Sequence, residues 1–260
     1  MGLILCDGRM VSNPFYVKEL GINIYSLEEL CYLIVNYPYI SLDDFADDKL
    51  IYFVNTELRI PVHGDNNDEI IFSILYCSDY YSYREIDNFK DVQSSLRQLP
   101  KYEFMSQKGD FLYKIEKYGK AEYYYKKALS EAEYQKVNSV FIGLLWKKIG
   151  CCRANLFHIE SAYEAFRKSY DHNKETDTLK YIYFLSKQQP KINLKQEYLQ
   201  FLDDRVDDSW DMEFEDILAS AEKCREIESF KHSLETDSVR RRKVLLNELD
   251  NLKTGYRNML

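Results

Sequence analysis

The chain has 260 residues, of which 45% are hydrophobic and 30% charged, and its formal net charge is −8 at pH 7. This composition supports a large apolar core, in one long helical array or in two small domains. The negative charge disfavours nucleic acid as the main partner, because phosphate recognition requires a basic surface. No apolar run is long enough to span a membrane, and the first residues lack the features of a signal peptide, so we expect a cytoplasmic protein without membrane attachment.

Residues 1–95 are predicted to form a small, mostly helical N-terminal cap. Two short apolar stretches, residues 3–6 (LILC) and residues 22–25 (INIY), could pair as a minimal two-stranded ribbon. Pro14 lies between them and suits the first position of a short helix. The cap therefore combines a little ribbon with helices.

Three further helices are expected in this cap. Ser26 has a glutamate three residues later, which is the signature of a capping box, and Pro38 should end the helix that follows. A second helix should begin at Ser41, and its acidic first turn explains the aspartates at 43–48 better than a cation site does. Asp68 or its neighbour should cap the third helix.

A pattern then occurs twice within residues 102–176, each position 41 residues after its counterpart, as from Gly109 to Gly150. Small residues at matched positions let two antiparallel helices approach to the usual 8–10 Å. An aromatic residue one turn after the alanine can fill the groove towards the next hairpin. A hairpin of this kind cannot bury both its faces alone and needs neighbours. The matched pairs are Gly109 and Gly150, Ala121 and Ala162, and Tyr125 and Phe166.

These residues resemble the tetratricopeptide repeat (TPR), whose pattern is Trp, Leu-Gly, Tyr, Ala, Phe, Ala and Pro at set positions. The second copy departs from this pattern at Arg153, where the family has tyrosine. The family's repeat is about 34 residues long, so a 41-residue step implies longer helices or a longer turn. The second copy keeps Trp146, Gly150, Ala162 and Phe166, and the first keeps Gly109, Ala121 and Tyr125.

The resemblance implies an all-α fold, a superhelical array of antiparallel helical hairpins (a TPR-like α-solenoid), over residues 96–207. A third, decayed hairpin at about 175–207 rests on periodicity alone. The tail, residues 208–260, carries apolar residues at alternating steps of four and three, which suits a coiled-coil seam. Two helices folded back as a hairpin are the preferred interpretation of the tail, and one continuous helix that forms a homodimer is the rival.

If the hairpins stack as the resemblance implies, the first helix of each lines a concave groove that takes a peptide. The family's clamp for a terminal carboxylate uses lysine and asparagine one turn apart, and only Lys147 matches it. A chaperone-tail adaptor of that type is therefore not expected. Carried over position by position, the groove residues are Ser106, Asp110 and Tyr113 from the first copy and Lys147, Cys151 and Asn155 from the second.

The sequence contains no nucleophile elbow, phosphate loop, dinucleotide fingerprint or HExxH motif. Its six cysteines lack CxxC spacing and its four histidines do not cluster with them, so neither a metal nor a cofactor is expected. The basic run at 240–243 is interpreted as a solvated helix face.

We therefore expect a non-enzymatic scaffold or adaptor that binds another protein or a peptide. Two alternatives remain open. One is a homodimeric structural assembly protein that associates through residues 208–260. The other is a peptide-sensing regulator without a DNA-binding domain of its own.

Overall fold

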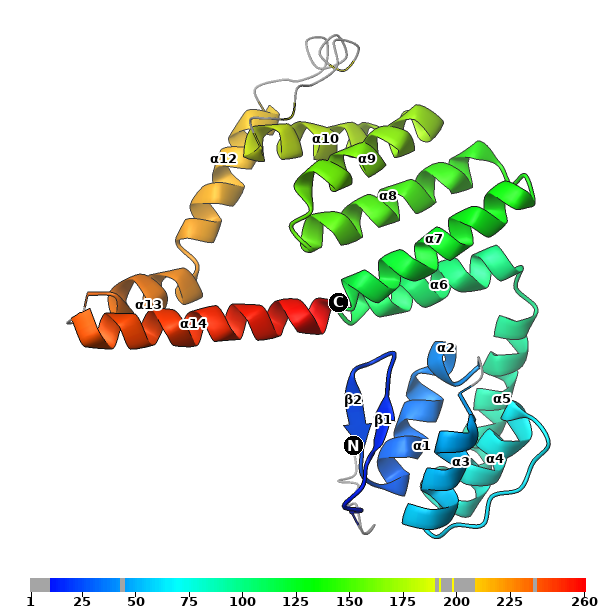
Figure 1. Ribbon diagram of the computed structural model, residues 1–260. Coiled ribbons are helices and arrows are strands. Elements are labelled where there is room, and N and C mark those ends of the chain that lie inside the picture. The colour runs from blue at the N-terminus through cyan, green and yellow to red at the C-terminus, as the bar shows by residue number, and fades with distance from the viewer. Residues whose placement is uncertain (1–9, 43–44, 190–191, 193–197, 199–208, 236–237) are drawn as a thin grey trace. The chain divides into compact units, whose positions relative to one another are not determined.

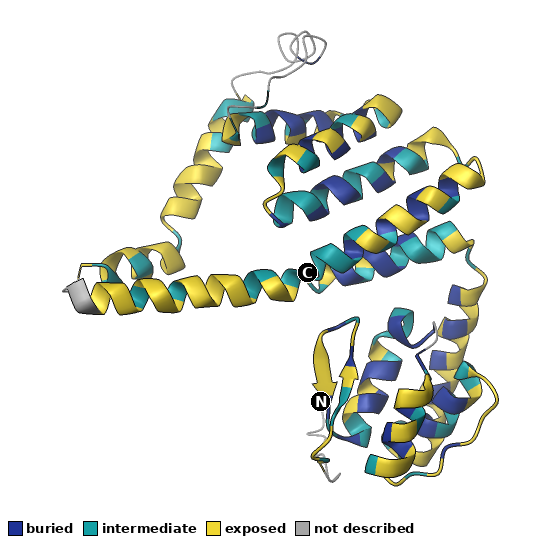
Figure 2. Ribbon diagram, in the orientation of Figure 1, coloured by how far each residue is buried: buried dark blue, intermediate teal, exposed yellow. Residues whose placement is uncertain are grey.

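The computed structural model describes residues 10–42, 45–189, 192, 198, 209–235 and 238–260. Within these residues the protein is all-α with one short two-stranded ribbon, which confirms the predicted fold class. The chain divides into two compact units, Met1–Phe111 and Leu112–Leu260. Figure 1 labels their helices and strands, and Figure 2 shows which parts are buried.

The ribbon of the first unit pairs strands β1 (Phe15–Val17) and β2 (Ile22–Ile24) in antiparallel register. The turn between them closes at Gly21, whose φ of 68° favours glycine. The prediction was right about the second strand and wrong about Pro14, which precedes a strand and not a helix. Aromatic and β-branched residues favour a strand after Pro14, and a short turn pairs it with the next apolar run. Residues 3–6 lie outside the described residues.

Helices follow the ribbon, and the first begins where the sequence indicates, because Ser26 Oγ accepts a hydrogen bond from Glu29 N at 3.2 Å. The third expected helix begins earlier than predicted, since its cap is Asn66, which accepts from Glu69 N and lies two residues before Asp68. The elements are α1 (Leu27–Asn36), α2 (Pro38–Ser41), α3 (Asp48–Tyr52), the π-helix η1 (Phe53–Glu57), α4 (Asn67–Cys77) and α5 (Tyr83–Arg97).

The expected helix start at Ser41 is wrong. Ser41 is the last residue of α2, and its buried hydroxyl donates to Ile34 O at 3.2 Å instead of capping a helix. The next helix begins after Asp47, whose carboxylate accepts from Leu50 N at 2.9 Å. Asp47 is therefore the cap of this helix and Asp48 lies in its first turn, whereas the prediction had Ser41 as the first residue. Residues 43–44 lie outside the described part of the chain.

The core of the first unit draws on α1, α3 and α4, whose fully buried residues are largely aliphatic and whose ribbons carry dark blue segments in Figure 2. Helix α6 (Lys101–Lys114) carries the boundary between the units. In the first unit its Phe111 stacks on Tyr39 with ring centroids 5.8 Å apart, and Tyr39 also donates to Gln107 Oε1 at 3.1 Å. The core side chains include Leu30, Leu33, Ile34, Leu50, Ile71, Ile74 and Leu75.

The second unit stacks helices in chain order, and this confirms the expected sequence of packed helix pairs. Helix α7 contacts α8, α8 contacts α9, and α9 contacts α10 (Figure 1). The helices are α7 (Tyr118–Tyr134), α8 (Ser139–Asn155), α9 (Ile159–Asn173) and α10 (Thr176–Gln188).

The 41-residue period extends to the backbone of the turns within the two hairpins. Helix α6 ends at Lys114 and α8 at Asn155, 41 residues later. Each turn then holds one non-glycine residue in the left-handed region, Glu116 with φ 62° and Phe157 with φ 59°. The closing hydrogen bonds also match, because Lys117 N donates to Leu112 O at 2.9 Å and His158 N to Arg153 O at 2.8 Å. The two turns are therefore copies of one structure.

The matched small and aromatic residues meet in the second hairpin. A Cβ on Gly150 would lie 2.6 Å from the ring of Phe166, so only glycine allows this approach. On its other side Phe166 contacts the ring of Tyr181 in α10, with centroids 5.1 Å apart. Phe166 therefore fills space within its own hairpin and towards the next helix. Gly109, Ala121, Tyr125 and Ala162 are buried, and Trp146 is half-buried beneath the Lys168 ammonium.

The tail is divided into three helices, not the two of the expected hairpin. They are α12 (Ser209–Glu222), α13 (Arg225–Ser233) and α14 (Ser238–Met259). Trp210 in α12 lies 5.8 Å from the ring of Tyr183 in α10. Most of the second helix expected at 175–207 lies outside the described residues, although Tyr198 is buried against Tyr170. No helix of the described part is long and apolar enough to cross a bilayer.

Candidate partner-binding surface

Three of the predicted groove residues come together where the first two hairpins meet. Asn155, in the last turn of α8, donates through Nδ2 to the Tyr113 hydroxyl at 3.0 Å and to Cys151 O at 2.9 Å. Tyr113 belongs to the last turn of α6, so this hydrogen bond links consecutive hairpins directly. The half-buried Tyr113 ring also packs edge-on against Tyr118, with centroids 5.1 Å apart.

The pKa values of Tyr113 and Cys151 are both raised above their ordinary values. Burial, reinforced by the neighbouring Cys151, raises the pKa of Tyr113 to about 12, and the hydrogen bond from Asn155 offsets this only in part. Burial likewise raises the pKa of Cys151, against the lowering effect of Lys147. Both side chains therefore stay protonated near neutral pH, where the thiol is a weak nucleophile.

Lys147 lies one turn before Cys151 on α8, but its charge already has a partner. Its Nζ donates to Glu175 Oε2 at 3.0 Å, at the start of α10, and lies 5.9 Å from the centre of the Tyr181 ring. Burial alone would lower the pKa of Lys147, but the hydrogen bond and charge of Glu175 raise it above its ordinary value. This stretch of surface is therefore close to electrically neutral.

The remaining two predicted residues belong to the first unit. Ser106 is only 3% exposed, so it lies in the interior of the first unit and not on a binding surface. Asp110 is exposed, and its charge contributes to the raised pKa of Tyr39, after the larger effect of burial.

One aromatic residue that the sequence analysis missed extends this surface onto α10. Tyr181 is 40% exposed and lies beside Lys147. The aromatic run of the third helix, residues 181–184 (YIYF), was the available signal. We name the combined surface the inner strip, and it consists of Tyr113, Lys147, Cys151, Asn155 and Tyr181.

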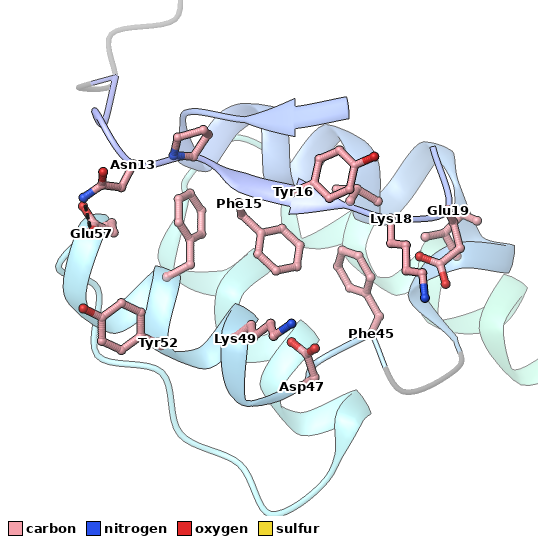
Figure 3. Close-up of a pocket in the computed structure, with 14 residues that line it drawn as sticks. Asn13, Phe15, Tyr16, Lys18, Glu19, Phe45, Asp47, Lys49, Tyr52 and Glu57 are labelled. Carbon is pink, nitrogen blue, oxygen red and sulfur yellow. Dashed lines mark hydrogen bonds between the residues drawn. The ribbon is translucent and has the colours of Figure 1, made fainter. Parts of the chain in front are cut away.

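A second candidate is a cleft of about 580 Å³ in the first unit, which the sequence analysis did not predict (Figure 3). Its floor is aromatic. The ring of Phe15 meets Phe45 edge-on at 6.0 Å and Phe53 at 5.7 Å. These phenylalanines come from three different segments, so no local pattern could have revealed their meeting.

The rim of this cleft is polar and of mixed charge. Asp47 and Lys49 lie on one side, and Asn13 donates to Glu57 Oε1 at 3.2 Å on another (Figure 3). Asp47 is already engaged as the cap of α3.

No group of three or more histidine, cysteine or acidic side chains gathers as a metal site would within the described residues. Comparison with family models, curated proteins and solved structures gives no match to this chain.

Proposed function

We propose that the chain is a non-enzymatic scaffold that binds another protein or a peptide along the inner strip, in the manner of a TPR array. The observation that carries this proposal is the hydrogen bond between Asn155 and Tyr113. It joins the first helices of two consecutive hairpins, so the strip is a single preformed surface. Preformed surfaces bind at a lower entropic cost than surfaces that must be ordered on contact.

The side chains of the inner strip also match the composition of binding surfaces. Tyrosine is enriched at such surfaces because its ring offers a large contact area and its hydroxyl can form hydrogen bonds. Tyr113 and Tyr181 supply two rings, and Asn155 adds an amide between them. Because Lys147 is neutralised by Glu175, we expect a partner segment with apolar and neutral polar side chains rather than a terminal carboxylate.

The free cysteines agree with a cytoplasmic location, which is part of the same proposal. Cys31, Cys77, Cys151, Cys152 and Cys224 are free thiols. Thiols persist in the reducing cytoplasm, whereas secreted proteins tend to carry disulfides.

Affinity capture from the source cells tests the proposal, with the tagged wild type beside a Tyr113→Ala, Lys147→Ala variant. The control is a Tyr123→Ala, Lys127→Ala variant. It removes the same two residue types from α7, where the Lys127 ammonium lies 4.5 Å from the Tyr123 ring. Circular dichroism would check that all three proteins are folded.

We expect the Tyr113→Ala, Lys147→Ala variant to bind the captured partner at least about tenfold more weakly than the wild type. Truncating a central aromatic anchor typically reduces affinity by that factor. The control variant should keep the partner. Equal capture by all three proteins, or loss from the control alone, would contradict binding at the inner strip.

A further inference from the structure

Helix α14 carries an apolar face that no other part of the described chain buries. Leu245, Leu249 and Leu252 are 46%, 46% and 64% exposed. No described side chain of α12, α13 or α14 is buried at all. A helix held by its own propensity alone is marginal in water, so an amphipathic helix normally gains stability by covering its apolar face.

The three leucines occupy one heptad seam. Their spacing of four and then three residues places Leu245 and Leu252 at d and Leu249 at a. This register puts Glu248 at g and Lys253 at e, the two positions that flank the seam. Both side chains carry charge, and both lie on the surface of α14.

These two charges indicate which helix can cover the seam. In a parallel pair of helices, each g residue faces the e residue five positions further along the other helix. Glu248 of one copy then faces Lys253 of a second copy, and symmetry forms this pair twice. In an antiparallel pair, each g residue faces a g residue of the other helix. In the registers that align the leucines, Glu248 would then face either Glu248 or Gly255 of the second copy, and neither offers an opposite charge. Charge complementarity therefore selects a parallel pair.

We propose that α14 forms a parallel, two-stranded coiled coil with α14 of a second copy of this chain. Leu245, Leu249 and Leu252 form its seam, and two Glu248–Lys253 pairs flank it. The proposal does not depend on partner binding at the inner strip. It assigns the exposed leucines of the tail a role that the inner strip does not explain.

The seam is short because the last turn of α14 contacts its own chain. The Tyr256 hydroxyl lies 3.2 Å from His158 Nε2, and Lys117 Nζ donates to Asn258 O at 2.9 Å. The leucines themselves span residues 245–252, just over one heptad, and Arg242 occupies the preceding a position. An interface of this length is small beside the roughly 1,200 Å² of a standard stable complex, so we expect a weak dimer with a dissociation constant in the micromolar range.

Sedimentation velocity of the full chain, from about 1 to about 200 μM, tests the dimer. The wild type should pass from monomer to dimer over this range. Leu249→Asp should raise the dissociation constant at least about tenfold, because it places a charge inside the seam. Leu218→Asp is the matched control, since Leu218 is 49% exposed on α12 and lies outside the seam.

Charge exchange then tests the parallel orientation. Glu248→Lys alone should weaken the dimer roughly tenfold, because two pairs become repulsive. Glu248→Lys combined with Lys253→Glu should restore it, because both pairs become attractive again with their signs exchanged. Lys253 is exposed and Glu248 is half-buried, so circular dichroism would verify that the single and double variants stay folded.

A chain that stays monomeric throughout the concentration range would overturn the proposal. A dimer that survives Leu249→Asp would overturn the seam. A dimer that Glu248→Lys leaves unchanged would overturn the parallel register. None of these outcomes bears on capture of another protein by the inner strip, so the two proposals fail independently.

Discussion

At the scale of single residues, the contact between Gly150 and Phe166 sets the spacing of the second hairpin. Phe166 is 2% exposed and is held between α8 and the Tyr181 ring, so it has no space to move aside. We expect Gly150→Ala to lower the free energy of unfolding by about 1–3 kcal/mol through overpacking. This loss should outweigh the gain of about 1 kcal/mol from the higher helix propensity of alanine. Urea unfolding measures the difference.

Gly255 provides the matched control for Gly150. It also lies within a helix, but no heavy atom would lie within 4 Å of an added Cβ. Gly255→Ala should leave stability unchanged or raise it by up to about 1 kcal/mol. Equal destabilisation by both substitutions, or none by Gly150→Ala, would refute the role given to Gly150.

The ion pair between Glu122 and Arg153 ties the first hairpin to the second. Arg153 Nε donates to Glu122 Oε1 at 2.8 Å, and Lys126 contacts the same oxygen. Burial raises the pKa of Glu122, but the hydrogen bonds from Lys126 and Arg153 lower it below 4.5 overall. We expect Glu122→Gln to cost about 1.5–3 kcal/mol at pH 7, the usual value of hydrogen bonds to a charged group.

The same ion pair predicts a pH dependence. A carboxyl group whose pKa is lower in the folded state than in the unfolded state stabilises the fold above the unfolded value. For Glu122 this stabilisation is complete well above pH 4.5 and is lost as the pH falls through the lowered value. The stability gap between wild type and Glu122→Gln should therefore shrink below about pH 4.5. A gap that stays constant down to pH 3, seen in urea unfolding, would exclude this linkage.

The ion pair of Arg153 could not be predicted from the sequence. It stands where the tetratricopeptide pattern has tyrosine, and the sequence showed only that the pattern was broken. Its partner Glu122 lies 31 positions away in another hairpin. An ion pair between distant residues leaves no local periodicity, so it was not visible in the sequence. The hydrogen bond from Asn155 to Tyr113 was not predicted for the same reason, although both residues were predicted to lie on the binding surface.

At the scale of elements, the sequence predicted the paired helices of the second unit because small residues mark where helices touch. In both hairpins the first helix ends, and the turn after it follows, at positions 41 residues apart. The left-handed residues in those turns, Glu116 and Phe157, were not predicted, because neither is a glycine or an asparagine. The strand at Phe15–Val17 was not predicted, because Pro14 before it suggested a helix start.

Differences in burial between elements predict different rates of amide exchange. The backbone amides of α8 near Gly150 and of α9 near Ala162 lie in the fully buried part of the second unit. They should therefore exchange more slowly than the other amides of this unit. Those of α12 and α13, which contain no buried residue, should exchange at least about tenfold faster in dilute solution. Hydrogen exchange followed by mass spectrometry measures both sets together. Equal protection of α12 and α8 in dilute protein would contradict this expectation.

At the scale of the whole molecule, the second unit combines two proposed surfaces with separate tasks. The inner strip is built from residues of α6, α8 and α10, and the leucine seam belongs to α14. A parallel dimer would carry two copies of the strip on one particle. A partner with two matching segments would then bind with a higher effective concentration at the second site.

The central claim is that the inner strip contacts a partner, and site-specific photo-crosslinking in the source cells tests it most directly. A photo-crosslinking phenylalanine analogue would replace Tyr113 in one protein and Tyr123, which is exposed on α7, in a control. Illumination should join a second polypeptide to the protein labelled at position 113 and not to the control. Absence of any adduct at position 113, or the same adduct at both positions, would contradict the account.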